Sequence, residues 1–227
     1  MTWPKAMVEK IRTYDNAGDI IIVDNGSTFE PLLDWYRSGP CEVVFCKNLG
    51  HKGPWLSGVV KKLNSEFYVV SDPDLGLEDT PADTLVFLAE KMKRLKLTKI
   101  GLGLDWKLTD INSPFYNHLI NYEGKRWGNS RIQDDIYLDI PIDTTFALYN
   151  DKKHFIGGAS SGFPYIAKHY PWYFTNEERK NNVEFMYYLN HATFSSSYKK
   201  FLNLTSSQPI MTRLVNKLSI LLGNVSR

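Results

Sequence analysis

The chain has 227 residues, enough for one large domain or two small ones, and its contents of 43% hydrophobic and 23% charged residues are ordinary for a globular protein. Its formal net charge is only +2, so a nucleic-acid-binding role has no electrostatic support. The sequence shows neither an apolar run long enough to span a bilayer nor the apolar core of a signal peptide near its start.

The first elements predicted are a helix, a strand and a turn. Residues 4–14 have the apolar spacing of a helix with Pro4 in its first turn. Residues 19–23 (DIIIV) form a β-branched run without alternation, which is typical of a strand buried on both faces. The polar turn over 24–28 (DNGST) follows this strand and precedes a further helix. A parallel sheet of this type normally starts with a strand before its first helix. We therefore expect either that the protein lacks this first strand or that the chain begins after it.

Two more strands follow in the same rhythm. A strand is predicted over 42–46, and the polar glycine loop over 47–54 then opens a helix near 55–63. The apolar run over 67–71 is a third strand, and it ends at Asp72-Pro73-Asp74. The alternation of strand and helix favours an α/β fold with a mostly parallel, doubly wound sheet.

The second half of the chain is less regular. A helix over 81–95 and a short strand over 99–104 complete the regular part. The remaining predictions are a helix over 112–123, one or two strands over 139–149, an aromatic loop over 163–174 and a helix over 176–190. No domain boundary is evident within these residues.

The segment Asp72-Pro73-Asp74 is the strongest candidate for a ligand site. In open α/β sheets, ligands bind at the carboxyl ends of the strands. Two carboxylates at such an edge suit Mg²⁺ or Mn²⁺, and these ions are usually shared with substrate phosphates. The alternative is a turn that simply ends the strand, because Asp-Pro-Asp-Leu-Gly is favourable turn chemistry.

Three motifs occur in a fixed order at the ends of successive predicted strands. They are Val23-Asp24-Asn25-Gly26-Ser27-Thr28, Asn48-x-Gly50 and Asp72-Pro73-Asp74. This series resembles the nucleotide-binding half of glycosyltransferases with the GT-A fold, and most closely the large, mostly inverting family whose second strand ends in Val-Asp-Asp-Gly-Ser. The resemblance covers roughly residues 4–105 well and 106–200 weakly.

The resemblance implies a division of the chain. A single Rossmann-like GT-A domain would span 1–205, with a nucleotide-sugar half over 1–105 and an acceptor half over 106–205. Residues 206–227 would be a C-terminal amphipathic helix or linker. From Ile210 to Leu222 the apolar residues have helical spacing. Such a helix packs on its own domain or leads to another; the alternative is an interfacial membrane helix, which would be the route to any membrane association.

The resemblance also implies contacts with the donor. Asp24 and Asn25 would lie beneath the uracil or other base. Asn25 stands where the family usually has aspartate, but its amide oxygen can still accept a hydrogen bond. The residues that would line the nucleotide-sugar are Asn48, Gly50, His51 and Lys52. The alternative for the two basic side chains is a solvated loop beside a helix start.

A metal site is implied by the same resemblance. Asp72 and Asp74 would hold Mn²⁺ or Mg²⁺ against the diphosphate, and Asp72 would also reach the ribose. His169 is the natural third ligand, because several GT-A subfamilies supply a histidine late in the chain; a lone histidine is more often structural. The metal would neutralise charge on the departing nucleoside diphosphate.

Inverting transfer needs a base that takes a proton from the acceptor hydroxyl. The candidates are Asp134, Asp135 and Asp143. We prefer Asp143 because it stands between Ile142 and Thr144 in an apolar run, where burial would raise its pKa. Asp134-Asp135 resembles the acidic dyad that precedes a helix in many relatives. The alternative for all three is a capping or surface acid.

The expected function is therefore metal-dependent transfer of a hexose from a nucleoside-diphosphate sugar, of UDP type, to a hydroxyl of a sugar or glycan acceptor. One alternative is a sugar-1-phosphate nucleotidyltransferase, which usually begins with a glycine-rich basic loop that is not visible here. Another is a non-catalytic glycan-binding domain with a degenerate site. Cys41 and Cys46 are five residues apart. On one strand an odd separation puts side chains on opposite faces, so we expect no disulfide between them and a cytoplasmic protein.

Overall fold

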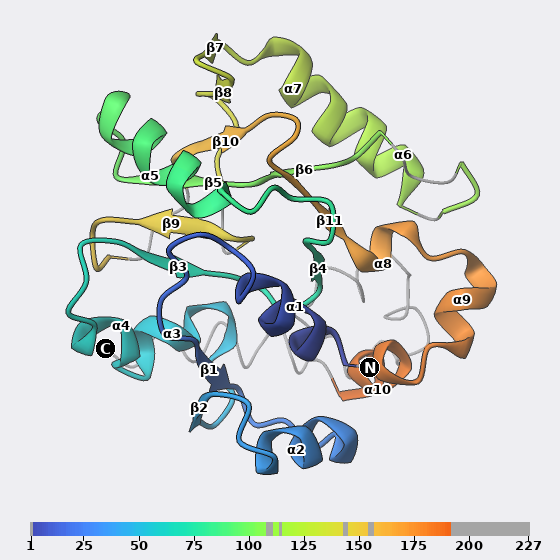
Figure 1. Ribbon diagram of the computed structural model, residues 1–227. Coiled ribbons are helices and arrows are strands. Elements are labelled where there is room, and N and C mark those ends of the chain that lie inside the picture. Colours follow the sequence, from blue (N-terminus) through green and yellow to red (C-terminus); the bar gives the residue numbers. More distant parts are fainter. Residues whose placement is uncertain (1, 108–110, 114, 143–144, 154–156, 192–227) are drawn as a thin grey trace, which may run out of the picture. The chain divides into compact units, whose positions relative to one another are not determined.

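A computed structural model describes residues 2–107, 111–113, 115–142, 145–153 and 157–191 (Figure 1). The chain separates into two compact units, Met1–Glu184 and Phe185–Arg227. In the second unit the described residues, 185–191, continue helix α10 (Val183–His191). The predicted helix from Ile210 to Leu222 and the candidate base Asp143 lie outside the described residues.

The first two predicted strands are confirmed and lie side by side. Strand β1 (Ile21–Asp24) pairs in parallel with β2 (Glu42–Phe45), in the register Ile21 opposite Glu42. Helix α1 (Trp3–Ile11) precedes β1, and helix α2 (Glu30–Arg37) connects the two strands. The carboxyl ends of β1 and β2 therefore meet at one edge, as the sequence predicts.

The third predicted strand belongs to a separate, six-stranded sheet. Its order is β3-β9-β5-β10-β8-β7. The strands are β3 (Tyr68–Val70), β5 (Lys99–Gly101), β7 (Ile132–Gln133), β8 (Ile136–Tyr137), β9 (Ala147–Tyr149) and β10 (Ala159–Ser161). Strand β9 comes from late in the chain and lies antiparallel between β3 and β5 (Figure 1). A three-stranded sheet contains β4 (Leu75–Gly76), β11 (Ile166–His169) and β6 (Gly103–Leu104).

The protein is mixed α/β, but the prediction of a mostly parallel sheet is wrong. Among the described residues, β1–β2, β5–β10 and β6–β11 pair in parallel, and the five other strand pairings are antiparallel. Alternating helices and strands set the direction of successive strands but not which strands become neighbours. All three residues of β9 are buried, so this strand suits an interior position that the chain order does not reveal.

Successive residues of the central strands serve two different cores. On β9, Leu148 belongs to a core that α1 and α5 (Thr84–Arg94) supply with Met7 and Met92, among others. The neighbouring Tyr149 belongs to a second core together with Val60 and other side chains. This alternation is the two-residue period of a β-strand, and it sandwiches the sheet between helices.

Two further predictions are corrected. The helix expected near 55–63 is divided into α3 (Gly53–Leu56) and α4 (Val59–Lys62), because Gly58 adopts a φ of 81° at the start of α4. The segment 163–174, expected to be a loop, contains β11 and the helix α8 (Tyr170–Tyr173). The other elements are α6 (Tyr116–His118), the π-helical turn η2 (Leu119–Gly124), α7 (Lys125–Asn129) and α9 (Asn176–Asn181).

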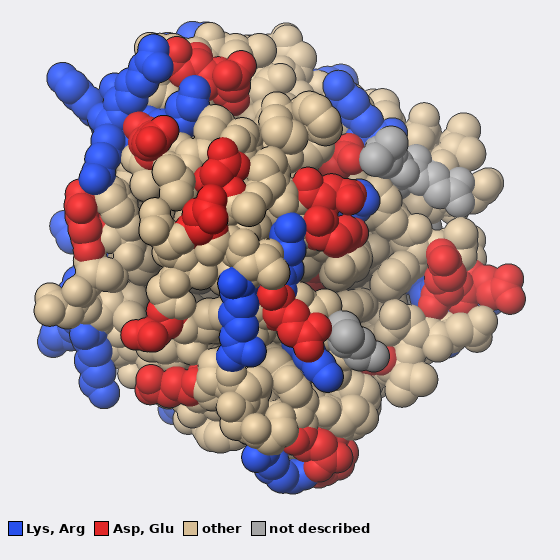
Figure 2. All heavy atoms as spheres, in the orientation of Figure 1, with Lys and Arg blue, Asp and Glu red and all other residues tan. Residues whose placement is uncertain are grey.

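Charged side chains of both signs are interspersed on the face shown in Figure 2, and they form no broad basic field there. No helix in the described ranges is both long and apolar enough to cross a membrane.

Candidate functional site

Asp24 organises the turn at the end of β1. Asp24 is only 4% exposed, and its Oδ1 accepts hydrogen bonds of 2.9 Å from the backbone N–H groups of Gly26 and Ser27. The Tyr36 hydroxyl of α2 donates to Oδ2 over 3.3 Å. Burial and the Asp24 carboxylate both raise the pKa of Tyr36. Asp24 thus fixes the turn and the start of α2 from inside the protein.

Asn25 joins the turn after β1 to the loop after β2. Its Nδ2 donates to the Gly50 carbonyl over 2.8 Å, and its Oδ1 accepts the Leu49 N–H over 3.0 Å. Gly53 lies close as well, since a Cβ there would be 3.2 Å from Asn25 Oδ1. The resemblance assigns the Asn25 amide oxygen to a hydrogen bond with the nucleotide base. In the structure this oxygen already accepts one hydrogen bond within the protein.

The loop after β2 carries the other predicted donor contacts. Asn48 Oδ1 accepts the Gly50 N–H over 2.9 Å, and Gly50 has a φ of 67°, which favours glycine. His51 and Lys52 follow in the short turn η1 (Gly50–Lys52), and both are exposed. The structure thus brings Asn48 and Gly50 beside Asn25 and leaves the two basic residues at the surface.

The aspartate segment after β3 lies beside the residue predicted as the late metal ligand. Strand β4 follows Asp74 directly and pairs antiparallel with β11, so that Leu75 lies opposite His169. The Asp74 carbonyl accepts the Tyr170 N–H over 3.0 Å. The His169 Nε2 atom is 3.8 Å from Asp74 Oδ1, and the two side chains are 12% and 15% exposed. The structure therefore brings Asp74 and His169 together.

The donor set at this pair fits a divalent cation in part. A carboxylate oxygen and an imidazole nitrogen are both accepted by Mn²⁺. Asp72 is half-buried in the same turn. In the part of the chain that the structure describes, no three His, Cys, Asp or Glu side chains are grouped to hold a metal ion. A cation at Asp74 and His169 would thus take further oxygens from substrate or water, as Mg²⁺ sites usually do.

The two acids Asp134 and Asp135 form the turn of the β7–β8 hairpin. Their φ angles are 54° and 65°, as a tight hairpin turn requires. The Arg94 Nε atom lies 3.0 Å from Asp134 Oδ2, and Lys91 Nζ lies 4.0 Å from Asp135 Oδ2. The dyad therefore precedes a strand and not the helix that the resemblance implies, and its described ion pairs are with α5.

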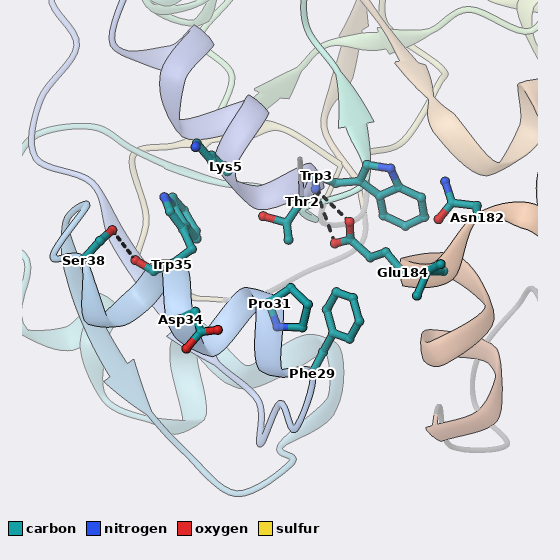
Figure 3. Close-up of a pocket in the computed structure, with 11 residues that line it drawn as sticks. Thr2, Trp3, Lys5, Phe29, Pro31, Asp34, Trp35, Ser38, Asn182 and Glu184 are labelled. Carbon is teal, nitrogen blue, oxygen red and sulfur yellow. Dashed lines mark hydrogen bonds between the residues drawn. The ribbon is translucent and has the colours of Figure 1, made fainter.

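Sequence reasoning missed a pocket of about 640 Å³ that lies between the start of α1, helix α2 and residues 182–184 (Figure 3). Its lining residues are Thr2, Trp3, Lys5, Phe29, Pro31, Asp34, Trp35, Ser38, Asn182, Val183 and Glu184. None of them was a predicted site residue. The high tryptophan content is the one sequence signal that could have drawn attention to them.

Glu184 links this pocket to the metal-ligand candidates. Both of its carboxylate oxygens accept the Trp3 N–H, over 3.3 and 3.2 Å (Figure 3). The pKa of Glu184 is raised to about 6, mainly by burial and to a smaller extent by the negative charge of Asp74, against the lowering effect of the Trp3 hydrogen bond. The charge of Asp74 therefore acts on Glu184, which lies on α10. The sequence did not indicate that this helix contributes to a site.

The candidate residues thus form two groups: Asp24, Asn25 and the loop over 48–52 at the ends of β1 and β2, and the Asp74–His169 pair beside the β4–β11 pairing. Comparison with known proteins assigns the chain to no family. No family model matches the chain, and no curated protein or solved structure matches it significantly.

Proposed function

We propose that this protein is a metal-dependent glycosyltransferase that moves a hexose from a nucleoside-diphosphate sugar, of UDP type, to a hydroxyl of a sugar or glycan acceptor, with inversion. The observation that carries the proposal is the Asp74–His169 pair. The two side chains are far apart in sequence, largely buried and 3.8 Å apart at the end of a strand. A structural turn at Asp72-Pro73-Asp74 does not require a histidine at that place.

Asp74 and His169, with Asp72 beside them, would hold Mn²⁺ or Mg²⁺. When bound, such an ion would supply charge neutralisation for the departing nucleoside diphosphate. Two protein side chains are compatible with this, since ions of this kind commonly share their coordination sphere with substrate phosphates.

The strand-end loops support a nucleotide ligand. Asn25 holds the loop after β2 against the turn after β1, so the two loops present one surface. The exposed His51 and Lys52 on that loop would attract an anionic ligand such as a diphosphate. Asp24 supports the surface from beneath and is itself too buried to offer much contact area.

We assign the proton-accepting role to Asp143. The two other candidates, Asp134 and Asp135, are held in a hairpin turn by Arg94 and Lys91, which accounts for their charges without catalysis. A base facing the acceptor hydroxyl would remove its proton as the sugar is transferred. We place the protein in the cytoplasm, a proposal that is supported by the free thiols of Cys41 and Cys46.

The test is a panel of UDP- and GDP-sugars, each with and without Mn²⁺, in which thermal stability and release of nucleoside diphosphate are measured. We expect stabilisation that needs both the nucleotide-sugar and the metal, and that the Asp74→Ala variant lacks. Asp143→Asn should keep this stabilisation but lose transfer. If no nucleotide stabilises the wild-type protein under either condition, the proposed function is wrong.

A further inference from the structure

The pocket of Figure 3 contains a buried hydroxyl group without a hydrogen-bond partner among the described residues. Thr2 is 8% exposed, and its Oγ1 makes no hydrogen bond with any described residue. In Figure 3 this hydroxyl points to the side of the pocket where Trp35 lies. A buried polar group left unpaired costs about 1–3 kcal/mol, so its place on a pocket wall is best explained by a ligand that completes the bond.

The pocket walls offer flat apolar surfaces. The rings of Trp3, Phe29 and Trp35 line it from α1 and from the start and middle of α2 (Figure 3). Trp3 is held by neighbouring rings, since its centroid lies 6.2 Å from that of Tyr170 and 6.0 Å from that of Phe174. Rings that are already packed lose little freedom when a ligand stacks on them.

The polar groups of the pocket are mostly hydrogen-bond acceptors or neutral. Carboxylates come from Asp34 and Glu184, against one ammonium group from Lys5. The Asn182 amide and the Thr2 hydroxyl are neutral donors and acceptors. Lys5 is the one basic side chain among the described lining residues and offers a phosphate or another anion little to bind, so we do not assign this pocket to the diphosphate.

We propose that this pocket binds one neutral hexopyranose ring, as the site of the sugar acceptor. A pyranose has apolar C–H faces that suit the aromatic walls, and hydroxyl groups around its rim that suit the carboxylates, the amide and Thr2. The volume of about 640 Å³ lies within the range of about 300–1,000 Å³ typical of small-molecule sites. The role as acceptor site rests on the proposed function.

The experiment is a titration of the full chain with the methyl glycosides of glucose, galactose, mannose and N-acetylglucosamine, without nucleotide or metal, followed by saturation-transfer NMR and calorimetry. We expect at least one glycoside to bind. Thr2→Val, which keeps the shape of the side chain, should weaken this binding about tenfold, the equivalent of one hydrogen bond of about 1.4 kcal/mol. Trp35→Leu should weaken it further by removing a wall.

Matched controls are Thr98→Val, at an exposed threonine, and Trp106→Leu, at a half-buried tryptophan, neither of which lines the pocket. Both should bind the glycoside as the wild type does. Without ligand, Thr2→Val should be at least as stable as the wild type, since it removes an unpaired hydroxyl. Absence of glycoside binding, or equal binding by Thr2→Val and the wild type, overturns the inference. Nucleotide-sugar binding with Mn²⁺, measured on the same samples, shows separately whether the proposed function still holds.

Discussion

His169, at the end of β11, lies beside Asp74, the residue that precedes β4, with Nε2 and Oδ1 3.8 Å apart. The His169 ring also stacks on Trp172, with centroids 4.8 Å apart. Trp172 thus fixes the plane of the imidazole ring, while the Asp74 carboxylate lies at the Nε2 edge of that ring. This arrangement separates the packing of His169 from its capacity to bind a metal.

The first prediction uses this separation. His169→Phe should keep the stacking on Trp172 and a melting temperature close to that of the wild type, but should lose the Mn²⁺-dependent stabilisation by a nucleotide-sugar. His191→Phe is the control, because His191 also stacks on an aromatic ring, that of Tyr187, with centroids 3.9 Å apart. The measurement is the thermal shift that a nucleotide-sugar produces in each variant, with and without Mn²⁺. Unchanged Mn²⁺ dependence in His169→Phe would remove His169 from the metal site.

The second prediction concerns Glu184 and pH. Its pKa is raised from 4.5 to about 6, mainly by burial, so the folded protein holds the proton at pH values where the unfolded chain has released it. The free energy of unfolding contributed by this proton is fully present below pH 4.5 and is lost as the pH rises through about 6. Glu184→Gln should remove this fall, whereas Glu9→Gln, at an exposed position of α1, should keep it.

Asp74 provides an independent check on the same group. Its negative charge raises the pKa of Glu184, so Asp74→Asn should lower that pKa below about 6. Carboxyl ¹³C chemical shifts followed through a pH titration measure it directly. An unchanged value in Asp74→Asn would mean that the two carboxylates do not interact.

The third prediction tests the inserted strand β9. A Cβ on Gly101 would lie 2.7 Å from the Phe146 carbonyl oxygen and 3.2 Å from the Ala147 Cα, both of which are backbone atoms that cannot turn aside. Gly101→Ala should therefore lower the free energy of unfolding by about 1–3 kcal/mol. Gly128→Ala in α7 has open space around it and should be neutral or stabilising by up to about 1 kcal/mol. Urea denaturation of both variants gives the comparison.

The fourth prediction concerns the loops that Asn25 joins. Asn25→Asp would restore the residue that the resembled family has there, but would replace the donor to the Gly50 carbonyl by a carboxylate oxygen. We expect a loss of about 1–3 kcal/mol, because two acceptors would then face each other. Asn64→Asp, at an exposed position, should have almost no effect. If Asn25→Asp is as stable as the wild type, the bridge to Gly50 does not hold the loop.

Some of this molecule could be predicted from the sequence and some could not. The strands β1, β2 and β3 are strongly apolar and lie between clear turns, so their positions follow from local pattern. The place of β9 in the sheet, between β3 and β5, could not be found in this way, because long-range packing determines which strands become its neighbours.

The same distinction holds for the site. Asp72 and Asp74 stand at the end of a predicted strand, so local pattern finds them. His169 was suggested by family resemblance alone, and its segment was predicted as a loop. Thr2 and Glu184 carry no local signal in the sequence. They are singled out by burial and by lining the same pocket, and both features exist only after residues from the two ends of the first unit have come together.

The place of β9 has a consequence for how the chain is made. While residues 1–146 emerge from the ribosome, β3 and β5 each lack the partner that separates them in the finished sheet. Their open edges are available to other chains during this interval. The sheet that positions Asp74 becomes complete only after β9 and β10 have been synthesised. Fragments that end before β9 should therefore aggregate when expressed, and a minimal fragment that keeps the Asp74–His169 pair must extend at least through β11.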